Sequence, residues 1–306
     1  MDFDNIIDRI KEKKKRLDRA RPLPKAVLKN LKDYFSVEWT YNSNAIEGNT
    51  LTLRETQLVL REGITIKGIS LREHFEAKNH ERAIEYLEDL VTRKNKGILE
   101  KEIFSVHELV LSGIEEDYAG RYRDGQVRIT GANFVPPNSL KVSDLMEELF
   151  NWVNNNPENL DIIALVARFH HRFVWIHPFF DGNGRTSRLA MNLILMQQGF
   201  PPAVILKHDR KKYYEALNQA NNGEYNKLIL LIAQTIERSL DMYLEAIETK
   251  PKAEYISLSK LAKKFPFSQE YLSLLARTGK IDAYKQGRNW VSNEIAIERY
   301  LKTIFN

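Results

Sequence analysis

Apolar side chains recur at three- and four-residue steps along most of the chain, as they do on the buried face of a helix. The pattern is clear over residues 28–46 and continues over 51–60. Further amphipathic stretches occupy residues 75–90, 142–153, 160–176, 185–198, 213–220 and 228–247. Gly199, followed by Pro201 and Pro202, ends one of these stretches. The sequence therefore predicts an all-α body.

Residues 121–137, with the sequence RYRDGQVRITGANFVPP, interrupt the helical pattern. Asp124 and Gly125 form a turn dipeptide, and apolar Val127 and Ile129 alternate with polar neighbours. Two consecutive prolines close the segment. This combination predicts a short β-hairpin or an extended flap inside the helical body.

The C-terminal residues have an organisation of their own, beyond a polar segment at 248–254 that is typical of a linker. We expect a helix over 257–264, a helix over 268–277, a strand–turn–strand around Gln286-Gly287, and a last helix from Asn293. Ser257, Ser268 and Ser292 are suitable N-cap residues. The order of elements resembles a small winged helix-turn-helix domain.

The net charge of +5 is concentrated in this C-terminal region. Residues 252–306 contain ten Lys or Arg and five Asp or Glu, so residues 1–251 are formally neutral. A local basic excess favours a polyanionic partner. DNA could contact Lys263, Lys264, Lys280, Lys285 and Arg288, with Gln269, Glu270 and Ser273 near the start of the second helix. Protein contact or self-association is the alternative, because a fold alone does not define a function.

The composition excludes several classes of site. The chain has no cysteine, which rules out disulfides, a thiolate nucleophile, iron–sulfur clusters and cysteine-based zinc sites. Its longest apolar runs, at 162–167 and 228–233, are too short to cross a bilayer, so no membrane partner is expected. The first thirty residues hold no apolar stretch of signal-peptide length, and a cytoplasmic location is expected. The basic run at 11–16 is expected to be a solvated helix face.

The most informative segment is HPFFDGNGRTSR at residues 177–188, between two predicted helices. Asp181 supplies the hard oxygen ligand that suits Mg²⁺. Gly182 and Gly184 flank Asn183, so the backbone can turn tightly and expose its N–H groups. An EF-hand is excluded because Arg185 stands where the fifth loop position needs Asp or Asn, and a Walker loop is excluded because Gly-Lys-Ser/Thr is missing.

The helix after this loop adds positive charge. It begins near Arg185, so its N-terminal amides and the positive end of its dipole face the loop. Arg185 and Arg188 are three residues apart and share one helix face, from which both could reach one anion. Together with the imidazole of His177, the segment predicts a phosphate cradle beside a metal ligand and a base.

Residues 177–188 match without departure the HPFxDGNGRxxR signature of the Fic family of AMP-transferring enzymes. The resemblance extends to Gly120-Arg-Tyr-Arg123 with the 126–137 flap, which is similar to the substrate-aligning hairpin of the family. It also extends to residues 213–221, similar to the nucleotide-lining helix of the family. The resemblance thus covers roughly residues 100–250 and implies a helical Fic core.

The resemblance implies a role for each residue of the motif. His177 would be the general base that takes the proton from a Ser, Thr or Tyr hydroxyl of a target protein, Asp181 would hold Mg²⁺, and Phe179 would turn into the core. Arg185 and Arg188 would neutralise the outer phosphates of ATP. The residues implied to contact ATP are Asp181, Gly182, Asn183, Gly184, Arg185, Thr186, Ser187, Arg188, Ile129, Thr130, Gly131, Tyr213 and Asn221.

A second motif, SNAIEG at residues 43–48, resembles the inhibitory Ser/Thr-x-x-x-Glu-Gly/Asn motif of the family. It starts at Ser43, and Glu47 lies at the C-terminal end of a helix predicted over 31–47. There the helix dipole disfavours an anion, so Glu47 needs a cationic partner. The resemblance implies Arg188 as that partner. The competing interpretation is a solvated Glu at a helix end.

These observations predict a protein adenylyltransferase that depends on ATP and Mg²⁺ and is inhibited by Glu47. The expected domains are residues 1–100 with the inhibitory helix, 101–250 as the Fic core, and 253–306 as the winged helix-turn-helix-like domain. One alternative is a hydrolase that removes AMP at the same site. Another is a DNA-binding regulator whose core senses nucleotide, against which the intact His177 argues. Expected partners are a target protein, with DNA and a homodimer left open.

Overall fold

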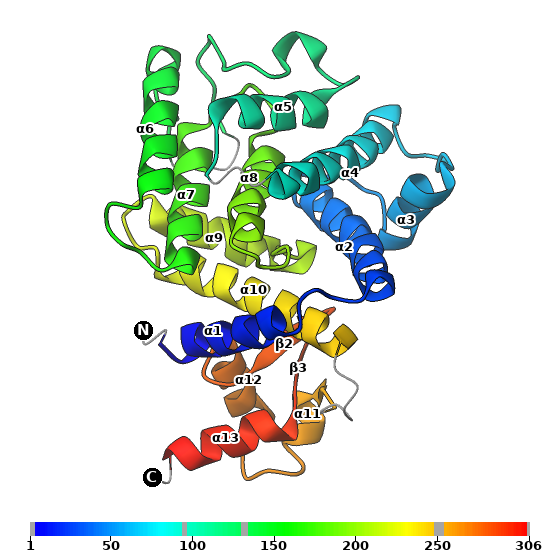
Figure 1. The fold of residues 1–306 in the computed structure, drawn as a ribbon, viewed down its shortest axis with the longest axis vertical. Coiled ribbons are helices and arrows are strands. Elements are labelled where there is room, and N and C mark those ends of the chain that lie inside the picture. The colour runs from blue at the N-terminus through cyan, green and yellow to red at the C-terminus, as the bar shows by residue number, and fades with distance from the viewer. Residues whose placement is uncertain (1–3, 94–96, 130–133, 248–253, 305–306) are drawn as a thin grey trace. The chain divides into compact units, whose positions relative to one another are not determined.

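The computed structural model describes residues 4–93, 97–129, 134–247 and 254–304. Contacts divide the chain into two compact units, one made of Met1–Leu31 with Leu230–Asn306 and the other of Lys32–Ile229 (Figure 1). The boundaries fall inside α2 (Lys25–Ile46) and α10 (Asn226–Ile247). This division groups α1 (Asp4–Arg19) with the C-terminal residues, which no feature of the sequence predicted.

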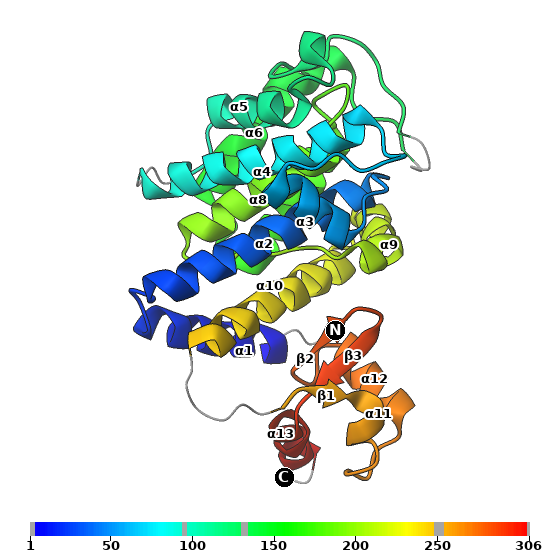
Figure 2. The same ribbon diagram turned by 90° about the vertical axis from the view of Figure 1, so that its right-hand side faces the viewer.

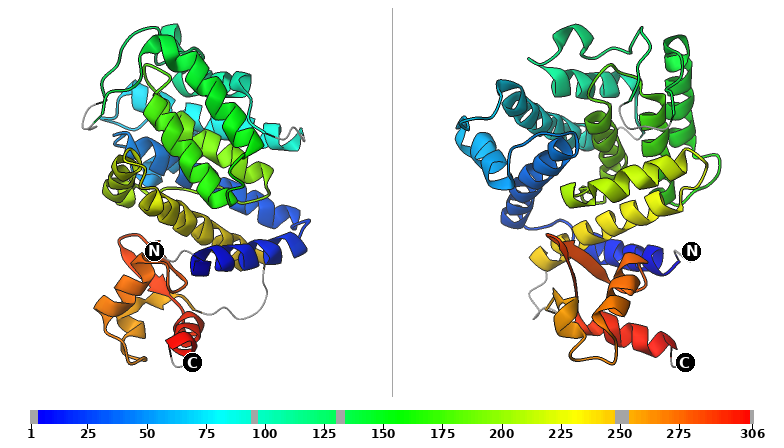
Figure 3. Two further views of the ribbon diagram at one scale, coloured as in Figure 1. Left: turned by 90° about the vertical axis from the view of Figure 1, so that its left-hand side faces the viewer. Right: turned by 180° about the vertical axis from the view of Figure 1, so that it is seen from behind.

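The Lys32–Ile229 unit is helical, which confirms the expected fold class. Helix α8 (Asn183–Gln197) is central to it. It packs against α7 (Ile162–Ile176), α4 (Leu71–Thr92) and α5 (Glu100–Leu111), and Figures 1 and 3 show it between α7 and α4. All side chains of residues 185–195 on α8 are buried. Besides α2 and α10, the other helices in this part of the chain are α3 (Leu53–Glu62), α6 (Val142–Asn155) and α9 (Arg210–Ala220), with 3₁₀ turns at Glu116–Tyr118, Ser139–Lys141 and Lys207–Asp209.

Capping boxes fix the start of α3 and of α4. Thr52 and Glu55 exchange hydrogen bonds at the start of α3, and Ser70 and Glu73 do so at the start of α4. Glu73 also accepts hydrogen bonds from the amide and hydroxyl of Thr50, at 2.7 and 2.6 Å. Burial raises the pKa of Glu73, but these hydrogen bonds outweigh it and lower the pKa to about 2. The segment after α2 is thereby tied to the first turn of α4.

Helix α5 was not predicted from the sequence. Its apolar residues Ile103, Val106, Val110 and Leu111 nevertheless repeat at helical spacing and are all buried. The helix carries His107, which is also buried and lies beside the 177–188 loop.

The sequence predicted a β-hairpin or an extended flap over 121–137, and the structure describes residues 121–129 and 134–137 of this segment. The described residues of 121–137 contain no strand, and the side chain of Arg123 holds the arms together in place of a ladder. Arg123 is buried and donates to the carbonyl oxygens of Gly125 at 2.9 Å and of Pro137 at 2.5 Å. The double proline removes two backbone donors from the second arm, which explains why side-chain donors take over. Thr130 and Gly131 lie outside the described residues.

The C-terminal residues form a small sheet with helices beside it (Figure 2). The strands are ordered β1-β3-β2 and are antiparallel. Gly287, with φ of +62°, closes the β2–β3 turn, as expected from Gln286-Gly287. The elements are β1 (Ile256–Ser257), α11 (Leu258–Leu261), α12 (Gln269–Arg277), β2 (Ala283–Gln286), β3 (Asn289–Ser292) and α13 (Glu294–Ile304).

Three details differ from the prediction for this region. Strand β1 was not predicted, and Ser257 belongs to it, so α11 is shorter than the expected 257–264 helix. Ser268 does cap α12, since its hydroxyl accepts a hydrogen bond from the amide of Tyr271. Ser292 does not cap α13: its hydroxyl donates to the carbonyl of Asp282, and Asn293 accepts from the amide of Ala296 instead.

A buried cluster of charges joins α1, α10 and the C-terminal region within their common unit. The ammonium of Lys13 lies 3.0 Å from Glu237, 2.7 Å from Asp241 and 2.8 Å from Asp282. Arg9 donates through Nε and Nη2 to both carboxylate oxygens of Glu237, at 2.8 and 2.9 Å. The basic run at 11–16 is therefore not a purely solvated face, because Lys13 is buried.

No helix among the described residues is both long and apolar enough to cross a membrane.

Candidate active site

His177 stands at the C-terminal end of α7, where its backbone is held on both sides. Its amide donates to the carbonyl of Phe173 at 3.0 Å, in the left-handed conformation with φ of +52°. Its own carbonyl accepts from Nε of Arg123 at 2.8 Å. Burial lowers the pKa of His177 to about 4, against the opposing effects of the Val174 backbone and nearby carboxylates. The imidazole is therefore neutral at pH 7 and able to accept a proton.

The loop after His177 is closed by the side chain of Asn183. Its amide oxygen accepts from the backbone N–H of Phe179 at 2.9 Å, and its amide nitrogen donates to the carbonyl of the same residue at 2.8 Å. The ring of Phe179 is buried and stacks on His107, with centroids 3.6 Å apart, as its expected core position requires. Asn183 thus shapes the loop and does not aim free side-chain groups into the cavity.

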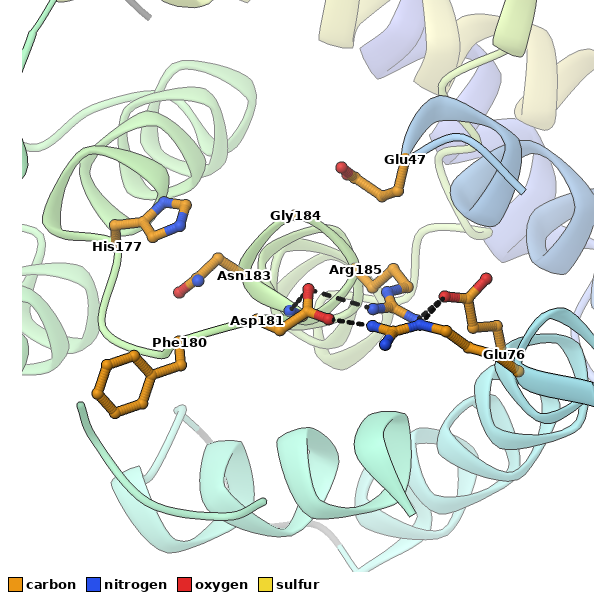
Figure 4. A pocket seen from close by; sticks show the side chains of 10 residues that line it. Glu47, Glu76, His177, Phe180, Asp181, Asn183, Gly184 and Arg185 are labelled. Carbon is orange, nitrogen blue, oxygen red and sulfur yellow. Dashed lines mark hydrogen bonds and ion pairs between the residues drawn. The ribbon is translucent and has the colours of Figure 1, made fainter. Parts of the chain in front are cut away.

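A cavity of about 280 Å³ opens above the N-terminus of α8 (Figure 4). Gly182, with φ of +74°, precedes the helix and provides no side-chain cap, which leaves the first amides of α8 available. Such a helix end is a favourable position for an anion. The cavity is lined by Glu47, Arg72, Glu76, His177, Phe180, Asp181, Gly182, Asn183, Gly184 and Arg185.

Asp181 is the carboxylate of this cavity that suits a divalent cation. It is 43% exposed, and its Oδ1 accepts from the amide of Gly182 at 2.6 Å. The described residues contain no group of three or more His, Cys, Asp or Glu side chains that could hold a metal by themselves. One carboxylate completed by substrate phosphates and waters is a usual arrangement for Mg²⁺, and the donor set fits that ion.

Arg185 provides positive charge at the floor of the cavity. Its guanidinium is nearly buried, with Nη1 3.5 Å from Glu76 and Nη2 3.6 Å from Asp181. Its Nε makes no hydrogen bond with any described residue. A buried N–H donor without an acceptor destabilises the fold, and a phosphate oxygen of a bound ligand would supply the acceptor.

Glu47 and Arg188 form an ion pair beside the cavity, with Oε1 2.7 Å from Nη1. Arg188 is buried and also donates to the hydroxyl of Ser43 at 3.0 Å and to its carbonyl at 2.8 Å. Burial lowers the pKa of Arg188, but Glu47 outweighs this and raises it. A Cβ at Gly184 would lie 2.0 Å from Oε1 of Glu47, so the carboxylate lies directly against the N-terminus of α8.

Neighbouring side chains hold the segment that carries Glu47. Nε of Arg210 donates to the carbonyl of Ile46 at 2.7 Å and caps the end of α2. Asn44 donates to the carbonyl of Glu76 at 3.1 Å, and Asn49 donates to the carboxylate of Glu76 at 2.8 Å. Glu47 is thus placed by α9 and α4 as well as by Arg188.

Several residues that the sequence assigned to nucleotide are not among those that line the cavity. Thr186 and Ser187 are buried within α8, and the hydroxyl of Ser187 donates to the carbonyl of Gly184. The hydroxyl of Tyr213 lies 2.8 Å from Nε2 of His170, and Asn221 lies 2.9 Å from Nε2 of His171. Ile129 is half-buried in the flap and is not among the residues that line the cavity.

His107, Arg72 and Glu76 belong to the site but were not predicted from the sequence. Nδ1 of His107 accepts from the amide of Gly120 at 3.0 Å, so Nε2 carries the proton and donates to the carbonyl of Asp181, also at 3.0 Å. Burial lowers the pKa of His107 to about 4, which keeps this neutral form. The ring therefore connects the base of the flap to the loop that carries Asp181. No local motif marks these residues, since α4 and α5 reach the site through tertiary packing.

Comparison with known proteins identifies relatives of this arrangement. The sequence profile of the Fic/DOC family matches residues 97–195. Fic-1 of C. elegans, solved over its residues 134–508, is 31% identical with a TM-score of 0.71, covering 80% of this chain and 73% of that one. A Fic domain containing signaling protein of Bacteroides thetaiotaomicron is 29% identical with a TM-score of 0.72, covering 81% and 99%.

Among curated proteins, the protein adenylyltransferase Fic of Nematostella vectensis is 39% identical over 250 residues. The match covers 80% of this chain and 57% of the relative. The corresponding protein of Aedes aegypti is 36% identical over 249 residues, which covers 79% of this chain and 50% of the relative. The chain thus spans about half the length of these curated relatives.

Proposed function

Because the chain belongs to the Fic/DOC family, we propose that it is a protein adenylyltransferase that moves AMP from ATP to a hydroxyl side chain of a target protein. The observation that carries the proposal is the cavity in which a neutral imidazole, an exposed carboxylate and the free N-terminus of α8 meet. These are the groups that transfer of a nucleotidyl group to a hydroxyl requires.

His177 is the base in this reaction. The oxygen of the target hydroxyl attacks the α-phosphorus of ATP, and its proton passes to the imidazole of His177. The bond between the α-phosphorus and the oxygen that bridges to the β-phosphate breaks, and pyrophosphate leaves. Because burial keeps the pKa of His177 at about 4, the base is unprotonated across the physiological range.

The phosphates are held by the loop and by α8. The amides at the start of α8 and the nearly buried guanidinium of Arg185 face the cavity where the triphosphate would lie. Mg²⁺ bound at Asp181 would neutralise phosphate oxygens as charge develops on the leaving pyrophosphate. His107 positions Asp181 by its hydrogen bond to the backbone of that residue.

We also propose that Glu47 inhibits this reaction. Its carboxylate pairs with Arg188 and lies against Gly184, at the helix end that favours a phosphate. ATP would then bind with its outer phosphates displaced and its α-phosphate out of line with the attacking hydroxyl. The pairing of both Glu47 and Ser43 with Arg188 supports this role.

The test is transfer of label from ATP to protein. With Mg²⁺ and ATP labelled at the α-phosphate, Glu47→Gly should attach acid-stable label to itself faster than the wild type does. ATP labelled at the γ-phosphate is the matched control and should leave no label, because that phosphate departs with pyrophosphate. A folded Glu47→Gly protein that binds ATP and gains no α-label would contradict the proposed activity.

The reverse reaction, hydrolysis of AMP from a modified protein, would use the same cavity, because the carboxylate of Glu47 lines it and could orient a water. Two substrates distinguish the directions. With a target that already carries AMP, release of AMP that depends on Glu47 indicates hydrolysis. With an unmodified target and ATP, transfer of AMP that increases when Glu47 is removed indicates addition.

For the C-terminal region we propose a winged helix-turn-helix that binds DNA. Two helices followed by the β2–β3 hairpin support this fold, and Lys263, Lys280 and Arg288 are exposed on it. Lys264 instead pairs with Glu294. Mobility shifts of duplex DNA should weaken steeply with salt and should weaken further with Arg288→Gln on the hairpin turn, but not with Lys302→Gln on α13. No shift at low salt would favour a protein partner.

A further inference from the structure

Arg72 holds the carboxylate that would bind the metal. Its Nη2 lies 2.6 Å from Oδ2 of Asp181, and the same guanidinium lies 3.2 Å from Glu115 and 3.5 Å from Glu76. Arg72 is the second residue of α4, where the helix dipole disfavours a cation. Local helix chemistry therefore does not explain its position, whereas the surrounding carboxylates do, and Asp181 is the nearest of them.

Both oxygens of Asp181 are engaged in this structure. Oδ1 accepts from the amide of Gly182 at 2.6 Å, and Oδ2 faces Arg72. A divalent cation needs direct contact with a carboxylate oxygen, at about 2.0–2.1 Å for Mg²⁺. An oxygen with two lone pairs can accept a hydrogen bond and still bind a metal, but the guanidinium places a full positive charge 2.6 Å from Oδ2 and repels a cation there. Metal binding at Oδ2 is therefore favoured when Arg72 withdraws.

The exposure of the pair allows such an exchange. The side chain of Arg72 is 46% exposed and that of Asp181 is 43% exposed, and an ion pair so open to water breaks at little cost. Arg72 also lines the cavity above the N-terminus of α8, where phosphates would lie. Once it leaves Asp181, the guanidinium has a new anionic partner within the same cavity.

We propose that Arg72 competes with the divalent cation for Asp181 and moves to the phosphates when the metal arrives with its nucleotide. This inference rests on the proposed function, which places Mg²⁺ at Asp181. It makes loading cooperative: metal alone must break the Arg72–Asp181 pair, whereas metal with a triphosphate gives Arg72 another partner. Such coupling is reciprocal, so nucleotide should tighten metal binding and metal should tighten nucleotide binding.

The test measures binding of Mn²⁺ by electron paramagnetic resonance on the full chain, with and without α,β-methylene-ATP, which cannot transfer AMP. Without nucleotide, Arg72→Met should bind Mn²⁺ about two- to fivefold more tightly than the wild type, as expected for loss of an exposed ion pair. With the analogue bound, Arg72→Met should gain nothing or bind more weakly. Arg72→Gln is the second variant, and Arg93→Met, which removes the Arg93–Asp89 pair at the other end of α4, is the matched control.

Each outcome separates this inference from the proposed function. Asp181→Asn should remove the Mn²⁺ site in every background, and Mn²⁺ binding that does not depend on Asp181 would contradict the metal assignment itself. Binding that depends on Asp181 but is unchanged in Arg72→Met would overturn only the competition. Tighter Mn²⁺ binding both with and without nucleotide would also overturn it, because simple charge repulsion acts equally in the two states.

Discussion

The carboxylate of Glu47 lies 2.7 Å from the guanidinium of Arg188, and the same carboxylate lies against Gly184 at the start of α8. One side chain thus engages a cation that the signature motif provides and fills the position beside the helix end that suits an anion. The two effects would act together on a bound triphosphate. Removal of Glu47 therefore releases both the cation and the space.

The first prediction concerns this inhibition. Glu47→Gly should accelerate self-labelling from α-labelled ATP. The rate rises tenfold for each ~1.4 kcal/mol by which the activation free energy of transfer is lowered. Ser43→Ala should give a smaller gain, because Arg188 loses one acceptor and keeps Glu47. Arg188→Ala combined with Glu47→Gly should cancel the gain, since both changes act through one cation.

Glu62→Gly is the matched control for this series. Like Glu47, Glu62 is exposed and precedes a glycine with positive φ at the end of a helix, but it is not among the residues that line the cavity. It should label at the wild-type rate. Circular dichroism should show every variant folded. Equal labelling rates for Glu47→Gly and Glu62→Gly would show that Glu47 is a solvated helix-end residue without an inhibitory role.

The second prediction concerns the base. In the Glu47→Gly background, His177→Ala should abolish transfer and still bind α,β-methylene-ATP, because other groups hold the phosphates. The pH dependence has a defined sign: the base works in its neutral form, and burial lowers the pKa of His177 to about 4. Glu47 raises that pKa, so its removal cannot move the midpoint upward. Transfer should stay constant from pH 8 to about pH 6 and fall only toward pH 4.

A midpoint near the ordinary histidine value of about 6.5 would show that the imidazole is solvated in the working enzyme. His208→Ala is the control, since His208 pairs with Asp209 and is not among the residues that line the cavity. It should leave both the rate and the pH profile unchanged.

The extent to which the sequence predicted the site follows from where its groups lie in the chain. His177, Asp181 and Arg185 lie within one segment of the chain, residues 177–188, so their chemistry could be recognised from residue types and spacing. The pairing of Glu47 with Arg188 could be inferred only through the family resemblance. Arg72 reaches Asp181 from another helix, and nothing in its own neighbours along the sequence indicates that contact.

For one physical reason, the sequence pattern could not show which of the residues assigned to nucleotide line the cavity. Helix α8 is buried on all sides over 185–195, so it has no polar face that would indicate which side chains point at the cavity. Thr186 and Ser187 are therefore not distinguished from Arg185 by pattern. The buried side chain of Tyr213 likewise pairs with His170, a contact between α9 and α7 that no local spacing encodes.

The third prediction concerns the support of His177 by Arg123. This buried guanidinium donates to the carbonyls of His177, Gly125 and Pro137. Arg123→Met should leave them unsatisfied and misplace the imidazole, lowering kcat by roughly one to two orders of magnitude. The KM for ATP should change little, because Arg123 does not line the cavity.

Arg123→Lys should rescue only part of kcat, since one ammonium cannot reproduce the fork of donors. Arg121→Met is the matched control on the exposed side of the same segment and should retain full activity. If Arg123→Met raised KM and left kcat unchanged, Arg123 would act on nucleotide binding and not on the position of the base.

The last prediction concerns the stability of the unit formed by α1, the end of α10 and the C-terminal region. Lys13 is surrounded by Glu237, Asp241 and Asp282, and its ammonium is buried. Lys13→Met would remove the ammonium that these three carboxylates share, and would leave Glu237 its pair with Arg9. Removal of one partner from a buried charge cluster typically costs about 3–5 kcal/mol, so a clear drop in melting temperature is expected.

The loss should depend on pH with a definite sign. Burial raises the pKa of Asp241, so the folded state favours its protonated form, and the stability linked to that proton is lost as pH rises through the folded pKa. Without Lys13 the pKa of Asp241 rises further. The loss in free energy of unfolding of Lys13→Met relative to the wild type should therefore be larger at pH 8 than at pH 5. Thermal melting followed by circular dichroism at pH 5 and pH 8 measures the stability of the wild type and of Lys13→Met. The control is Lys15→Met, at an exposed position of α1. If Lys13→Met lost no more stability than Lys15→Met, the buried cluster would contribute no net stability.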